Sequence, residues 1–184
     1  MVGGGLGQGP VPPLPPGLAC VEIAAGGFHD LALLSDGSVV AWGYNAFGQC
    51  NVPALPQGLA YVEVAAGWQH SVARLDDGSV VAWGANDLGQ CNVPAPPPGL
   101  AYVEIAAGDY HSVALLSDGS IVGGGRNNGG KCDVPLFPAG LTYVEVGVGA
   151  FHTVGRRSDG TVIAWGDDTY DQCDVPPLPT GLTY

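Results

Sequence analysis

The sequence has few basic residues. Five Lys and Arg stand against 17 Asp and Glu, which gives a formal net charge of −12 over 184 residues. A surface that follows a phosphate backbone needs clustered Lys and Arg, so this composition argues against nucleic-acid binding. Eight of the acidic residues recur at fixed positions along the chain. We therefore attribute much of the acidity to solvated structural positions.

Long apolar runs and a charged-then-apolar leader are also missing, which argues against a membrane span and a secretory signal. No segment of helical length is free of both Gly and Pro, which together number 31 and 16, and this excludes a helical repeat. The five cysteines show no C-x-x-C spacing, so we expect no zinc site and no other metal or cofactor. Five reduced thiols, together with the absence of an N-x-S/T acceptor site, favour a cytoplasmic location.

What the sequence does contain is a repeat of 41 residues without insertions. Each unit carries one His, one Glu, one Asp-Gly pair and one Cys in the same register. These positions are His29, His70, His111 and His152; Glu22, Glu63, Glu104 and Glu145; Asp36-Gly37, Asp77-Gly78, Asp118-Gly119 and Asp159-Gly160; and Cys50, Cys91, Cys132 and Cys173. We treat residues 1–184 as a single domain, which begins with the end of a partial repeat. The predicted division is 1–18 for the partial repeat and 19–59, 60–100, 101–141 and 142–182 for repeats one to four.

The second repeat has the periodicity of β-strands. YVEVAAG (61–67) alternates in polarity, HSVARL (70–75) ends at a DDG turn, and SVVAWG (79–84) is rich in β-branched and aromatic residues. QCNV (90–93) is predicted as a short fourth strand that ends before a proline. Four antiparallel strands in a unit of this length are typical of a β-propeller blade. The predicted fold is therefore all-β, with four four-stranded antiparallel blades.

The stretch AAGWQHSVARLDDGSVVAWGANDLGQCNVP (65–94) resembles the repeat of the regulator of chromosome condensation family, and this resemblance extends over essentially the whole chain. It is especially similar to the branch that includes a propeller-type β-lactamase inhibitor protein. The resemblance implies a propeller that usually has seven blades, whereas this chain has about four. It implies no single function, because members include a nucleotide-exchange factor, a photoreceptor, ubiquitin-ligase domains and the inhibitor. We expect either a fragment of a longer propeller or a homodimer that closes an eight-bladed ring.

The recurring side chains are expected to be structural. The four His should make structural hydrogen bonds, and His70 and Ser71 cannot act as a base and a nucleophile together, because neighbours on a strand point to opposite faces. Trp42, Trp83 and Trp165 should fill the space between adjacent sheets. The third repeat has Gly124 at this position. We therefore expect the third blade to be poorly packed.

Recognition is expected at the positions that do not repeat, which follow AAG and WG in each unit. In an antiparallel meander alternate connections share an edge, so both variable loops should emerge on one face. Trp68 is the best candidate anchor, because its register otherwise holds Gly27, Asp109 and Ala150. An alternative is that the aromatics that share one register cap the central tunnel. The predicted binding residues are Phe28, Tyr44, Phe47, Trp68, Gln69, Asp87, Leu88, Asp109, Tyr110, Phe151, Asp168 and Tyr170.

The sequence thus predicts a non-enzymatic module that binds another protein through one variable face. No unique cluster of acid, base and nucleophile is present, so no catalytic residue is assigned. Two alternatives remain: a fragment of a larger propeller of the exchange-factor or ubiquitin-ligase-associated type, and an inhibitor of a secreted enzyme.

Overall fold

The computed structural model describes residues 10–136 and 138–178. The expected partial repeat, the third repeat and the fourth repeat are therefore covered in part, since residues 1–9, 137 and 179–182 lie outside the described residues. The described part of the chain consists of strands and connecting segments. The twelve strands are β1 (Cys20–Ala25), β2 (His29–Leu34), β3 (Val39–Gly43), β4 (Tyr61–Ala66), β5 (His70–Leu75), β6 (Val80–Gly84), β7 (Tyr102–Ala107), β8 (His111–Leu116), β9 (Ile121–Gly125), β10 (Tyr143–Val148), β11 (His152–Arg157) and β12 (Val162–Gly166).

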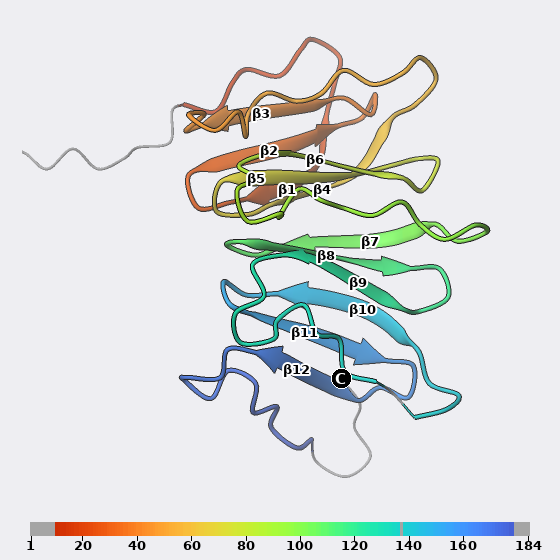
Figure 1. Ribbon diagram of the computed structural model, residues 1–184. Coiled ribbons are helices and arrows are strands. Elements are labelled where there is room, and N and C mark those ends of the chain that lie inside the picture. The colour runs from red at the N-terminus through yellow and green to blue at the C-terminus, as the bar shows by residue number, and fades with distance from the viewer. Residues whose placement is uncertain (1–9, 137, 179–184) are drawn as a thin grey trace, which may run out of the picture.

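Each repeat forms one antiparallel sheet whose strands follow chain order, β1-β2-β3 in the first repeat and likewise in the others. We call these sheets blades 1 to 4. They pack face against face in sequence order, with blades 1 and 4 at the two ends of the array (Figure 1). The upstream face of a blade points toward the preceding repeat, and its downstream face toward the following one. The prediction of an all-β array of propeller blades is confirmed.

The blades differ from the prediction in having three strands instead of four. In the second repeat, 90–93 is not a strand of the described structure. This segment bends through tight turns, with backbone bonds from Asn92 N to Gly89 O and from Val93 N to Cys91 O. The carbonyl of Gln90 accepts a bond from Ser112 of the next blade instead of from a neighbouring strand. The segment therefore connects two blades rather than widening one sheet.

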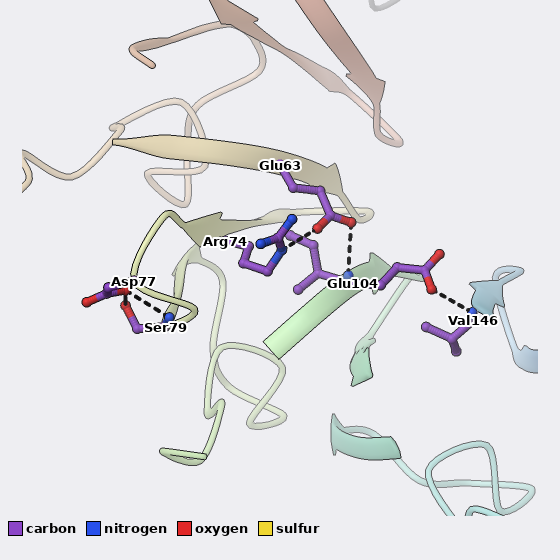
Figure 2. A network of polar contacts seen from close by, with 7 residues as sticks. Glu63, Arg74, Asp77, Ser79, Glu104 and Val146 are labelled. Carbon is purple, nitrogen blue, oxygen red and sulfur yellow. Dashed lines mark hydrogen bonds and ion pairs between the residues drawn. The ribbon is translucent and has the colours of Figure 1, made fainter. Parts of the chain in front are cut away.

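The Asp-Gly pairs form the turns between the second and third strands. In blade 2, Gly78 N donates to Leu75 O and Leu75 N donates to Ser79 O. Gly78 has a φ of 79°, the left-handed conformation that glycine adopts without strain. Asp77 accepts bonds from both the backbone and the hydroxyl of Ser79, at 2.9 and 2.6 Å (Figure 2). These contacts explain why Asp, Gly and a hydroxyl residue recur together.

The hydrophobic core lies between the sheets. At the first interface, Leu31 and Leu33 of blade 1 pack against Tyr61, Val64 and Trp83 of blade 2, all less than 9% exposed. Burial of side chains of this size stabilises the fold by about 1.5–3 kcal/mol each. Trp83 also donates its indole N–H to Gln49 O across the interface, at 2.9 Å. The predicted role of the periodic Trp between sheets is confirmed here.

Blade 3 has no Trp at this position, yet its strand is complete. Residues of β9 pair with β8 in the same register as in the other blades, including Ser112 with Gly124. The space between blades 2 and 3 beside Gly124 is a crevice of about 10 Å³, which is about the size of one water molecule. Where the other blades have a Trp, blade 3 therefore has a small crevice beside Gly124.

Candidate functional site

Both variable loops of each repeat emerge on the same face, as strand parity predicts. We call this the loop face; its loops are 26–28, 67–69, 108–110 and 149–151, and 44–48, 85–89, 126–130 and 167–171. Backbone bonds join the two loops of each blade: Tyr44 N donates to Phe28 O at 2.8 Å, and Ala85 N donates to Gln69 O at 2.9 Å. The two loops are therefore held together by the frame of each blade.

Four aromatic side chains meet on the loop face of blades 1 and 2. Phe28 packs edge-to-face against Trp68 with ring centroids 4.7 Å apart, and against Tyr44 at 6.1 Å. Tyr44 in turn packs against Phe47 at 6.2 Å. Tyr44 and Phe47 are each 45% exposed. We call Phe28, Tyr44, Phe47 and Trp68 the aromatic cluster.

Trp68 is half-buried and has structural contacts that the sequence did not indicate. A Cβ atom on Gly27 of blade 1 would lie 2.6 Å from the Trp68 ring, so the indole packs directly over this glycine. Together with its contact to Phe28, this places Trp68 across the interface between blades 1 and 2. The variability of this register therefore does not mean that Trp68 lacks structural contacts.

A second group of side chains lies on the loop face of blades 3 and 4. The guanidinium of Arg126 lies 6.0 Å from the Tyr110 ring centroid, and the Lys131 ammonium lies 5.8 Å from that of Phe151. Lys131 is 2% exposed and donates to Asn128 O at 3.1 Å. Burial, with the nearby charge of Arg126, lowers the pKa of Lys131.

Sequence reasoning did not select Lys131, although a signal was present. It occupies the register of Gln49, Gln90 and Gln172, so it is a cation where the other repeats have an amide. Phe151, by contrast, was predicted, and it is 42% exposed. The structure brings both residues together.

The inner ends of the loops surround a hollow of about 300 Å³. An Ala-Gly pair from each of blades 1 to 3 and Val148-Gly149 of blade 4 line it, together with Gly27, Trp68, Asp109 and Ala150. Burial raises the pKa of Asp109, against the opposing effect of the Lys131 charge. The glycines are required here because the blades approach backbone to backbone. A Cβ on Gly67 would lie 2.5 Å from Gly108 O and would also overlap the His70 ring.

The twelve predicted residues do not form one patch. Gln69 is half-buried beside the aromatic cluster, and Asp87 and Leu88 are exposed on the next loop of blade 2. Asp168 and Tyr170 belong to the loop of blade 4, at the opposite end of the array. Tyr170 is 87% exposed. The structure therefore separates an aromatic cluster on blades 1 and 2 from the residues of blades 3 and 4.

The recurring His residues link neighbouring blades, as predicted for a structural role. His70 Nε2 lies 2.9 Å from Ser112 Oγ, and that hydroxyl donates to Gln90 O at 2.8 Å. Because His70 is fully buried and the hydroxyl proton is held by a carbonyl, this pair has neither access to a substrate nor a free nucleophile.

Among the described residues, the remaining chemistry-bearing groups form neither a metal cluster nor a disulfide. In residues 10–136 and 138–178, no group of three or more His, Cys, Asp or Glu could hold a metal ion. The five cysteines, all in the described part, are unpaired. Burial raises the pKa of Cys91 to about 11, which disfavours its thiolate. Within the same described ranges, no helix is long and apolar enough to span a membrane.

Comparison with solved structures identifies similar folds. Yeast RCC1 (Prp20) bound to Kap60 is 24% identical with a TM-score of 0.72, covering 85% of this chain and 45% of that chain. Prp20p from Saccharomyces cerevisiae, reported with its binding to Gsp1p and histones, is 26% identical with a TM-score of 0.68, covering 82% and 44%. Human WBSCR16 is 21% identical with a TM-score of 0.70, covering 83% and 49%. The chain thus spans about half the length of these structures.

A search of the curated proteins finds no match. The family model for the regulator of chromosome condensation (RCC1) repeat, however, matches four segments, and these coincide with the strands and the loop face of the four blades. The matched residues are 20–49, 61–90, 102–131 and 143–172. The chain therefore belongs to the regulator of chromosome condensation (RCC1) repeat family.

Proposed function

We propose that this chain is a non-enzymatic module that binds another protein through its loop face. The observation that carries the proposal is the aromatic cluster, in which rings from two blades support one another while Tyr44 and Phe47 remain 45% exposed. Tyr and Trp are enriched at the energetic centres of protein interfaces, because a rigid ring buries a large area at a small entropic cost. Rings that are already packed lose still less freedom on binding.

The charge of the chain favours a basic protein partner. Three aspartates of the loop face, Asp87, Asp109 and Asp168, lie in different loops, and the chain as a whole has a formal net charge of −12. Such a field accelerates the approach of a positively charged protein. It repels the phosphates of nucleic acids, so we do not propose DNA or RNA as a partner.

The similar structures support protein binding as a class and no particular partner. Prp20 is seen bound to Kap60 and is described with its binding to Gsp1p and histones. Because this chain covers less than half of those chains, we do not transfer these partners. We keep as the alternative a part of a larger propeller of the exchange-factor or ubiquitin-ligase-associated type, which the 45% coverage favours. No specific contact favours the third candidate, an inhibitor of a secreted enzyme.

The location that we propose is the cytoplasm. Five unpaired thiols, of which Cys20 is exposed, are typical of proteins in a reducing compartment.

The test is a capture experiment with the immobilised chain, followed by measurement of the affinity for any captured protein. The double variant Tyr44→Ala/Phe47→Ala removes the exposed half of the aromatic cluster. We expect its affinity to fall about 30-fold or more, since an aromatic hot spot contributes about 2–4 kcal/mol.

The matched control is Tyr170→Ala, which removes an aromatic side chain from the same face but from the far end of the array. Its affinity should equal that of the wild type. Equal capture by all three proteins would show that the aromatic cluster is not the binding site.

A further inference from the structure

The three interfaces between blades use the same polar contacts. Glu63 accepts a bond from the backbone N–H of Ile105 in the next blade, and Glu104 accepts one from Val146, each at 3.0 Å (Figure 2). Each glutamate thus extends from the downstream face of its blade to the first strand of the following blade. The glutamate of a downstream face therefore binds a backbone N–H at the same repeat position in the first strand of the next blade.

The downstream face of blade 4 has the same groups, but nothing in the described structure covers them. Glu145 binds Arg156 at 2.7 Å, as Glu63 binds Arg74 at 2.7 Å. The pairs differ in exposure. The side chains of Glu145 and Arg156 are 57% and 37% exposed, whereas those of Glu63 and Arg74 in blade 2 are 18% and 23% exposed. Blade 4 therefore presents the same Glu–Arg pair as an interior interface, but on an exposed face.

This face is also hollowed. A depression of about 200 Å³ is lined by the Glu145–Arg156 pair together with Gly147, Val154 and Val162. Blades 1 to 3 have alanine in the register of Gly147. The missing methyl group leaves room on blade 4 for an apolar side chain.

The upstream face of blade 1 carries a side chain of that kind. Ile23 is 75% exposed, whereas Val64, Ile105 and Val146, in the same register, are 5 to 6% exposed. Its backbone N–H occupies the register that bonds to glutamate at the interior interfaces. Cys20 is likewise exposed in a register where the other blades bury a tyrosine. Blade 1 therefore presents the apolar and donor groups that the downstream face of blade 4 would bind.

Asp30 of blade 1 departs from the repeat in a way that suits a contact with blade 4. At the interior interfaces the His of one blade bonds to a Ser or Thr of the next, as His29 does to Ser71. Blade 1 has Asp30 in the register of that hydroxyl, and His152 is the His of blade 4. A contact between the two ends would join an imidazole to a carboxylate, which is a stronger hydrogen bond than one to a hydroxyl.

We propose that the downstream face of blade 4 binds the upstream face of blade 1 of a second copy of this chain, and that two such contacts close a ring of eight blades. The contact places Ile23 in the depression beside Gly147, the Ile23 N–H on Glu145, and Asp30 on His152. Different faces meet at this contact, and such a contact closes a ring only where the rotation between the copies brings the second pair of faces together. In the proposed eight-bladed ring, two copies use the contact twice and leave no bare end. The proposal is argued from the two end faces of the array and does not depend on protein binding at the loop face.

The test measures molar mass by light scattering during size-exclusion chromatography. The wild type should have the mass of two chains. Ile23→Arg and Glu145→Lys each change a side chain that is exposed in the single chain, so folding should be preserved, and each variant alone should have the mass of one chain. A mixture of the two variants should form a dimer, because one intact blade 1 face meets one intact blade 4 face.

Two further measurements separate this contact from any other self-association. Asp30→Ser should preserve the dimer, since Ser serves in this register at the interior interfaces, whereas Asp30→Lys should halve the mass. Cys20 should be protected from alkylation in the wild type and should react quickly in Glu145→Lys. Asp87→Lys, on the loop face, is the matched charge reversal and should leave the dimer intact.

A wild-type chain with the mass of one chain would overturn the proposal. So would a dimer that persists in both single-face variants, and so would open polymers in place of a closed pair.

Discussion

The imidazole of His29 and the hydroxyl of Ser71 lie 2.9 Å apart across the first blade interface, and the same hydroxyl bonds to Gln49 O at 2.8 Å. This direction of bonding requires that Nε2 of His29 carries the proton. Nδ1 is buried and has no hydrogen-bond partner among the described residues. A second proton would therefore place an N–H group in the interior without an acceptor, so the contact requires a neutral imidazole.

The first prediction is that the fold loses stability as the pH falls from about 6.5 toward 4. Burial lowers the pKa of His29, His70 and His111 to about 4, from an ordinary value of 6.5. In this window the unfolded chain binds more protons than the folded chain, so the free energy of unfolding decreases as the pH decreases. One pKa unit corresponds to about 1.4 kcal/mol, and we expect a total loss above ~3 kcal/mol.

Chemical denaturation at a series of pH values measures this effect. Burial raises the pKa of Glu22 and Glu104, which acts in the opposite direction. For that reason the decisive comparison is between the wild type and His70→Gln, whose amide keeps a donor but does not titrate. The variant should have a shallower slope between pH 6.5 and 4. Identical slopes would show that burial does not lower the pKa of His70.

Much of the fold can be predicted from the sequence, because residues that make the same contacts recur in register in each repeat. Strand parity alone places Tyr44 and Phe28 on one face, and the structure joins them by a backbone bond. The absence of a fourth strand could not be predicted from the local pattern, because QCNV (90–93) has strand propensity whereas its carbonyl at Gln90 bonds to the next blade. A sequence pattern of one repeat does not contain such contacts between repeats.

The candidate site was predicted less completely. Variability identifies the loops, but it cannot tell a free side chain from one that packs on a neighbouring blade. Trp68 is variable and also lies over Gly27, because that glycine leaves space for the ring. Lys131 was missed because it lies in a structural register, where its burial and its contact to Phe151 depend on the neighbouring blade.

The second prediction concerns the glycines of the inner strands. Gly67→Ala should destabilise the fold by more than ~2 kcal/mol, because its Cβ would overlap both the His70 ring and Gly108 O of the next blade. Thermal and chemical unfolding measure this change.

The matched control for this glycine is Gly147→Ala. A Cβ on Gly147 would have no heavy atom within 4 Å, and alanine occupies this register in the other three blades. We expect its stability to equal or exceed that of the wild type by up to about 1 kcal/mol. If both variants were equally destabilised, the close approach of the blades at Gly67 would not be the cause.

The last prediction compares two tryptophans on blade 2. Trp83 is 8% exposed, packs with Tyr61 and donates to Gln49 O, so Trp83→Ala should reduce the free energy of unfolding by about 3–5 kcal/mol. Trp68 is half-buried and packs with Phe28, so Trp68→Ala should cost a smaller amount, about 1–2 kcal/mol.

Partner binding should depend on these two residues in the reverse order. Trp68→Ala removes the support of the aromatic cluster and should weaken binding about 30-fold, measured at a temperature where the variant is fully folded. Trp83→Ala, measured under the same condition, should bind as the wild type does, because its side chain is buried between the blades and does not offer a surface to a partner. Equal losses of stability in the two variants would mean that Trp68 is a core residue, and unchanged binding in Trp68→Ala would exclude it from the interface.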